Sequence, residues 1–149
     1  MGAGELGKVG PAAGFSIFVD SGGWIAVNDP RDKQHKPACN FYRQKAIGDY
    51  VELVTTNLVI AETHAALLRA GGREKGLKFL SLIYSSSRVR VIHSTPELEE
   101  TAAGILVKYR DQDFSLCDAV SFAAMKEMGI RDAFAFDRYF ETAGFRRLP

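Results

Sequence analysis

The feature of this 149-residue chain that most constrains its fold is an alternation of short apolar runs with segments of helical character. The apolar runs are "FSIFV" (15–19), "YVELVTT" (50–56), "RVRVI" (88–92) and "AFAF" (133–136), with "GFRRL" (144–148) as a short fifth candidate. Continuously apolar runs are typical of strands buried on both faces of a parallel sheet, whose strands need helical crossovers. We therefore predict an α/β fold, a three-layer α/β/α sandwich around a central, mainly parallel sheet of four to five strands.

Capping residues and glycines indicate where the helices begin and end. Asn57 is predicted as the N-cap of a helix that stops at Gly71 and Gly72. Ser115, followed three residues later by Asp118, has the spacing of a capping box. The expected helices cover residues 24–27 (a short turn), 36–47, 58–70, 74–86, 96–110 and 116–128.

The composition describes one ordinary globular domain. The chain is 46% apolar and 25% charged, and no run approaches the roughly 20 apolar residues of a membrane span. We expect residues 1–14 to form a flexible lead-in and residues 15–149 to form the domain. Cys39 and Cys117 suggest neither a disulfide framework nor a zinc site, so reduced thiols in a cytoplasmic protein are expected. A net charge of +1 neither indicates nor excludes nucleic-acid binding.

Four acidic residues fall at equivalent places in this scheme. Asp20 and Asp137 end the first and fourth predicted strands, while Glu62 and Asp118 lie in the early turns of two helices. Carboxyl ends of strands and the following helix N-termini share the ligand-binding edge of an open α/β sheet. Clustered carboxylates repel one another unless a cation compensates them, and Mg²⁺ or Mn²⁺ suits such oxygen ligands. The pattern therefore favours metal-assisted hydrolysis of a phosphodiester.

Each acid also has a purely structural interpretation. Asp20 before "SGG" and Asp137 before "RYF" are each compatible with an ordinary turn. Asp118 is compatible with a simple helix cap, worth about 1 kcal/mol. Glu62 lies in an apolar stretch, which favours a functional role. Taken singly these signals are weak, and their shared edge is what gives them weight.

Four segments resemble the PIN-domain nucleases, particularly the VapC-type toxins of toxin–antitoxin pairs. They are "FVDSGGWIAVND", "TTNLVIAET", "DQDFSLCDAVSFAAMKEMGI" and "AFAFDRYFETAGFRRLP". The resemblance implies an acidic catalytic site formed by Asp20, Glu62, Asp118 and Asp137. It implies Mg²⁺ or Mn²⁺ bound mainly by Asp20 and Asp118. Four further residues stand where the family has recurrent polar residues. The resemblance therefore implies possible secondary polar contacts by Ser21, Thr56, Asp113 and Ser115.

The resemblance further implies an endoribonuclease acting on RNA as a toxin, a homodimer, and a cognate antitoxin protein. Alternatives are a housekeeping PIN-domain nuclease without an antitoxin and a non-catalytic RNA-binding PIN module. The apolar residues of "WIAV" and the helix with Phe41 and Tyr42 suit either a dimer face or, more commonly, plain core. Candidates for phosphate contacts are Arg43, Lys45, Arg69, Arg73, Lys75 and Arg138. A response-regulator-like domain is disfavoured because Asp137 stands where it needs a lysine.

Overall fold

The computed structural model describes residues 15–49 and 51–149, so the predicted lead-in lies outside the described residues. Five strands form one sheet in the order β3-β2-β1-β4-β5, and every neighbouring pair is parallel. They are β1 (Ser16–Val19), β2 (Glu52–Thr56), β3 (Val89–Ile92), β4 (Asp132–Phe134) and β5 (Arg146–Leu148). The predicted parallel sheet is confirmed, and "GFRRL" supplies its fifth strand.

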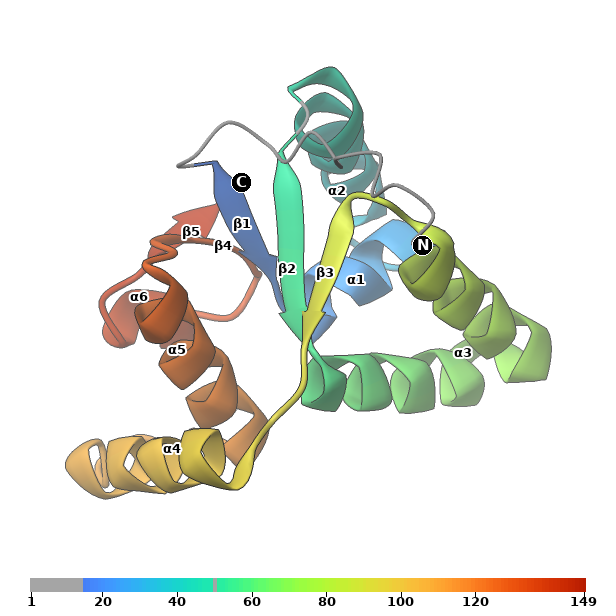
Figure 1. Cartoon of the computed structure of the whole chain (residues 1–149). Helices are drawn as coiled ribbons and strands as arrows, with labels where there is room; N and C mark the ends of the chain where they lie inside the picture. Colours follow the sequence, from blue (N-terminus) through green and yellow to red (C-terminus); the bar gives the residue numbers. More distant parts are fainter. Residues whose placement is uncertain (1–14, 50) are drawn as a thin grey trace, which may run out of the picture.

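The helices cover both faces of this sheet, which confirms the three-layer architecture (Figure 1). In Figure 1, α1, α2 and α3 lie on one side, and α4, α5 and α6 lie on the other. Among the described residues, no helix combines the length and apolar character that crossing a membrane requires. The helical elements are α1 (Ser21–Asn28), α2 (His35–Tyr42), the π-helical turn η1 (Arg43–Gly48), α3 (Asn57–Ser85), α4 (Pro96–Lys108), α5 (Leu116–Met128) and α6 (Tyr139–Thr142).

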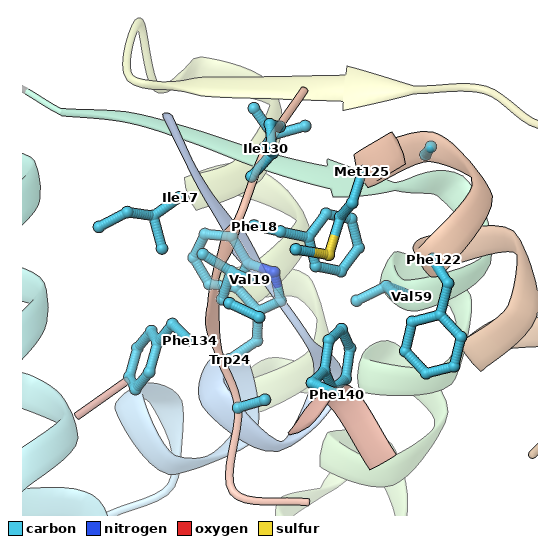
Figure 2. Close-up of a cluster of buried hydrophobic side chains, with 14 of the residues drawn as sticks. Ile17, Phe18, Val19, Trp24, Val59, Phe122, Met125, Ile130, Phe134 and Phe140 are labelled. Atoms are coloured by element: carbon cyan, nitrogen blue, oxygen red, sulfur yellow. The ribbon is translucent and has the colours of Figure 1, made fainter. Parts of the chain in front are cut away.

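A cluster of buried side chains holds the sheet against the helices (Figure 2). The Phe18 ring of β1 lies 6.1 Å from the ring of Phe140, which in turn lies 5.0 Å from Phe122 of α5. Trp24 is fully buried, and the ring of Phe41 lies 4.7 Å from that of Phe134. The apolar residues of "WIAV" and of the Phe41 helix therefore serve mainly as core, as the simpler interpretation proposed.

The N-terminus of α3 corrects one prediction. Thr56, not Asn57, is the N-cap, and its hydroxyl accepts a hydrogen bond from the backbone N–H of Val59 at 3.1 Å. Asn57 is the first helical residue, and its Oδ1 accepts the backbone N–H of Ser94 at 2.8 Å. The asparagine is therefore engaged by the segment after β3, which leaves the adjacent threonine to cap the helix.

The glycine pair predicted to stop this helix instead bends it. The two helices expected over 58–70 and 74–86 are joined as α3, in which Gly72 has non-helical angles (φ 79°). A positive φ is readily adopted only by glycine, so Gly72 lets the chain turn and resume the helix. After the bend, a side chain at Gly76 would lie 2.9 Å from the His64 ring, so the second half packs closely against the first.

Strand β4 is shorter than predicted and ends at Phe134 instead of residue 136. Its last paired residue is opposite Val19 of β1 on one side and Leu148 of β5 on the other. Both neighbours end there, so the chain leaves the sheet. Asp137 consequently lies in the loop after β4, three residues beyond the strand.

Candidate active site

The four predicted acids lie along the edge of the sheet where the strands end. Asp20 directly follows β1, Glu62 lies in the second turn of α3, and Asp118 lies in the first turn of α5. In Figure 1 the arrowheads of β1, β2 and β3 and the beginning of α3 lie at this same end. Asp118, Glu62 and Asp137 each act electrostatically on Asp20. The structure thus places the other three carboxyl groups within electrostatic range of Asp20, while their catalytic roles stay a prediction.

Asp20 is the most deeply placed of the four. Only 6% of it is exposed, and the backbone N–H of Ser21 donates to its carboxyl group. Burial raises the pKa of Asp20 from 3.8 to about 7, against the lowering effect of the Ser21 N–H. The negative charges of the other three acids contribute smaller parts of this rise. A carboxyl group in such surroundings favours either a proton or a cation.

The packing of α1 explains how Asp20 is held at this depth. A Cβ at Gly23 would lie 2.8 Å from the carbonyl oxygen of Phe134, so only glycine permits this close approach. The backbone N–H of Asp20 also donates to the Phe134 carbonyl at 3.1 Å. The beginning of α1 therefore packs closely against the end of β4. Asp20, the residue directly before α1, is held at this contact.

Asp118 performs the predicted capping role at the beginning of α5. Its Oδ2 accepts the backbone N–H of Ser115 at 2.9 Å, and the Ser115 hydroxyl accepts the backbone N–H of Asp118 at 3.0 Å. Burial raises the pKa of Asp118, hydrogen bonds from the backbone and the side chain of Ser115 to the carboxyl group lower it, and Asp137 and Glu62 raise it again. The backbone hydrogen bond of the cap is made to Oδ2, so capping and metal binding through the other oxygen are compatible roles for this residue.

Glu62 and Asp137 form the exposed part of the acidic cluster. Asp137 Oδ1 accepts the backbone N–H of Tyr139 at 2.7 Å, which orients the carboxylate at the start of α6. The loop that carries Asp137 is also held by Arg147, whose Nη1 donates to the carbonyl oxygen of Phe136 at 2.9 Å. Local hydrogen bonds therefore fix the backbone of an acid that faces solvent.

Cys117 is a neighbour of this cluster that the sequence did not single out. It is half-buried, and its thiol hydrogen-bonds to Glu62. Burial, the Glu62 hydrogen bond and the charges of Glu62, Asp20 and Asp118 all raise the pKa of this thiol. Cys117 is therefore a protonated thiol at neutral pH. The one available signal was its place directly before Asp118 at a helix start.

The other predicted polar positions have different surroundings. Thr56 and Ser115 are the N-caps of α3 and α5, so they position the helices that carry Glu62 and Asp118. Ser21 contributes its backbone N–H to Asp20. Asp113 is exposed in the loop before α5 and has no hydrogen bond among the described residues. Of the four positions, three support the acids structurally and one does not.

Two of the predicted phosphate contacts are engaged elsewhere. The Lys75 ammonium lies 2.9 Å from a carboxylate oxygen of Asp29, a residue only 7% exposed. Lys45 is paired with Asp49 at 3.1 Å. Lys75 thus connects α3 to the loop after α1, and neither lysine presents an unpaired charge to a substrate.

The donor set suits a hard divalent cation. All four acids offer carboxylate oxygens, and the charge that they concentrate around buried Asp20 calls for a counter-charge. Across residues 15–49 and 51–149, no three acidic, histidine or cysteine side chains lie close enough together to coordinate one metal ion. Mg²⁺ commonly binds through one or two carboxylates and keeps several waters, so a site centred on Asp20 and Asp118 fits this arrangement.

Comparison with known proteins identifies the class to which this architecture belongs. Residues 17–146 match the PIN domain family, and the chain belongs to that family. It is similar to VapC20 of Mycobacterium tuberculosis, a 23S rRNA-specific endonuclease. The two sequences are 37% identical over 129 residues, which cover 87% of this chain and 95% of that protein.

Solved structures give the same result for the fold. The crystal structure of the Mycobacterium tuberculosis VapC20 toxin, which cleaves the sarcin–ricin loop, superimposes with a TM-score of 0.79. It is 36% identical, and the match covers 87% of this chain and 95% of that chain. FitAcB from Neisseria gonorrhoeae has a TM-score of 0.61 at 11% identity, covering 89% of this chain and 96% of that one. This second likeness concerns the fold alone.

Proposed function

We propose that this chain is a toxin endoribonuclease of the VapC type that hydrolyses RNA phosphodiester bonds with Mg²⁺ or Mn²⁺. The observation that carries the proposal is that three further carboxyl groups act on buried Asp20 at the ligand-binding edge of a PIN domain. The 37% identity to a 23S rRNA-specific endonuclease supports RNA as the substrate.

The chain's own residues would perform four tasks in this reaction. Asp20 and Asp118 hold the cation, while exposed Glu62 and Asp137 complete the acidic surroundings. A bound cation supplies charge stabilisation at the phosphodiester and a nucleophilic water. The N-termini of α3 and α5, directed at this edge, favour the approach of a phosphate group. The Ser115 N–H orients Asp118, and the core behind α5 keeps that helix in place.

The substrate we propose is the sarcin–ricin loop of 23S rRNA. VapC20 cleaves this loop, and the similarity to VapC20 covers 87% of this chain. Proteins that read RNA by sequence act mainly on unpaired loops with splayed bases, and a hairpin loop meets that condition. A hairpin RNA of the sarcin–ricin sequence should therefore be cleaved faster than a hairpin with the same stem and a scrambled loop.

The test of the catalytic proposal uses Asp118→Asn. The asparagine Oδ1 can still accept the Ser115 N–H, so the helix cap is preserved and only the charge is lost. We expect cleavage to fall at least about 100-fold, since a charged ligand of the reacting centre is removed. The matched control is Glu127→Gln, an exposed acid near the other end of α5, which should cleave like the wild type. Cleavage by Asp118→Asn at the control's rate would contradict the proposal.

We also propose a homodimer and a cognate antitoxin as partners. Support comes from the VapC resemblance and from large apolar side chains that stay exposed on the helices, namely Leu68, Leu77, Tyr84, Val107 and Leu116. An acidic edge of this kind suits an antitoxin segment that carries basic residues. Light scattering after gel filtration should give twice the chain mass. Co-expression with the protein encoded beside this gene should relieve growth arrest.

A further inference from the structure

The peptide unit that joins Val19 to Asp20 is held at both ends where β1 leaves the sheet. The Asp20 N–H donates to the Phe134 carbonyl at 3.1 Å, and the Val19 carbonyl accepts the Thr55 hydroxyl at 3.0 Å. The paired register of β1 and β2 ends one residue earlier, at Phe18 and Val54. A side-chain hydroxyl therefore continues the contact between the two strands just beyond their last paired residues.

Trp24 closes this arrangement from α1. Its indole Nε1 donates to the Thr55 hydroxyl oxygen at 3.3 Å, and its backbone N–H donates to the carbonyl of Asp20 at 3.1 Å. Thr55 and Trp24 are both 0% exposed. The Thr55 hydroxyl thus uses its hydrogen on Val19 and accepts the indole hydrogen, which leaves it fully satisfied in the core.

A hydroxyl at this position needs a specific reason. Valine has nearly the same shape as threonine and belongs to the residues favoured in buried strands, whereas burying a hydroxyl is costly unless it is hydrogen-bonded. Among the described residues, the Thr55 hydroxyl hydrogen-bonds only to Val19, which precedes Asp20, and to Trp24, which lies one turn of α1 beyond it. Its effect is therefore directed at the backbone of Asp20.

We propose that the bridge formed by Thr55 and Trp24 is a positioning element that fixes the backbone of Asp20 and thereby the direction of its carboxylate. This inference rests on the proposed nuclease function. A carboxylate that is 6% exposed has little freedom to recover its direction through side-chain rotation, so the placement of its backbone decides where it points. Small misplacements at a reacting centre are costly, on the order of 100-fold for 1 Å.

The test compares Thr55→Val with a matched control, Thr63→Val. Thr63 is also 0% exposed, but its hydroxyl donates to the Val59 carbonyl within α3, at 2.7 Å. We expect Thr55→Val to lower kcat for RNA at least about tenfold with KM changed less than about twofold, because substrate contacts are untouched. Thr55→Ser, which keeps the hydroxyl, should restore cleavage, and Thr63→Val should cleave like the wild type.

Two measurements without RNA report on the bridge directly. Trp24 is the single tryptophan of the chain, so one indole N–H signal in a ¹⁵N spectrum follows its hydrogen bond. Hydrogen exchange of that signal should be faster in Thr55→Val than in Thr55→Ser by about tenfold, since the acceptor is lost. Mn²⁺ binding measured by calorimetry should weaken at least about threefold in Thr55→Val and stay unchanged in Thr63→Val.

Wild-type kcat and wild-type Mn²⁺ affinity in Thr55→Val would overturn the inference. Should that variant fail to fold, equal values for Thr55→Ser and Thr55→Ala would overturn it, because these two differ at the hydroxyl. Absence of RNA cleavage by the wild type would refute the proposed function instead. In that case Mn²⁺ affinity and indole exchange would still decide whether the bridge positions Asp20.

Discussion

The buried charge of Asp20 should make the metal-free protein less stable as the pH rises. The folded protein holds the Asp20 proton more tightly than the unfolded chain does, because burial, together with the neighbouring acids, raises its pKa from 3.8 to about 7. The stability from this proton is complete below about pH 4, declines as the pH rises, and is lost above about pH 7. The full effect corresponds to about 4 kcal/mol, and more than half of it falls between pH 5 and pH 8.

Asp20→Asn isolates this effect because asparagine does not titrate. Its amide has a burial cost of its own, but that cost is the same at both pH values and cancels in the comparison. The free energy of unfolding is measured in urea with EDTA at pH 5 and pH 8, following the fluorescence of buried Trp24. Wild type should lose about 2–3 kcal/mol more than Asp20→Asn over this interval. Equal losses in the two proteins would refute the reasoning, and Glu127→Gln should follow the wild type.

Two other sites, the ion pair of Asp29 and the thiol of Cys117, can be tested in the same way. Lys75→Met removes the closer of the two cationic partners of nearly buried Asp29, the other being Arg31, and should cost about 1–3 kcal/mol in urea unfolding. Lys45→Met breaks an exposed pair and should cost less than about 0.5 kcal/mol. Equal costs would mean that burial does not strengthen the first pair. Native Cys117 should react with iodoacetamide at least about tenfold more slowly than in urea, because its surroundings disfavour the thiolate. Mass spectrometry follows this rate, and equal rates would contradict the assigned surroundings.

Much of the fold was predictable because its determinants are local in the sequence. The alternation of apolar runs and helices predicted the parallel sheet, and the spacing of Ser115 and Asp118 predicted the capping box that the structure contains. Asn57 was less predictable, because a residue 37 positions away, Ser94, occupies its side chain. The bend at Gly72 similarly depends on packing between the two halves of α3, which no local pattern indicates.

The same distinction applies to the site. The four acids could be placed at one edge because each follows a strand or lies in the first two turns of a helix, and this follows from topology alone. The bridge between Thr55 and Trp24 joins residues 31 positions apart, and the pair of Asp29 and Lys75 joins residues 46 apart. Such contacts depend on how α1 and α3 pack. The sequence therefore predicted which acids lie at the same edge of the sheet, and it did not predict the contacts that fix their positions.

The most direct test of the proposed metal-dependent nuclease is a metal titration of cleavage on the sarcin–ricin hairpin. The protein is first stripped of metal with EDTA, and Mn²⁺ is then added to wild type and to Asp118→Asn. We predict no cleavage without metal, saturable recovery in the wild type, and at most about 1% of that rate in the variant. Cleavage that persists in EDTA, or equal recovery in both proteins, would contradict the assignment of the acidic cluster as the catalytic metal site.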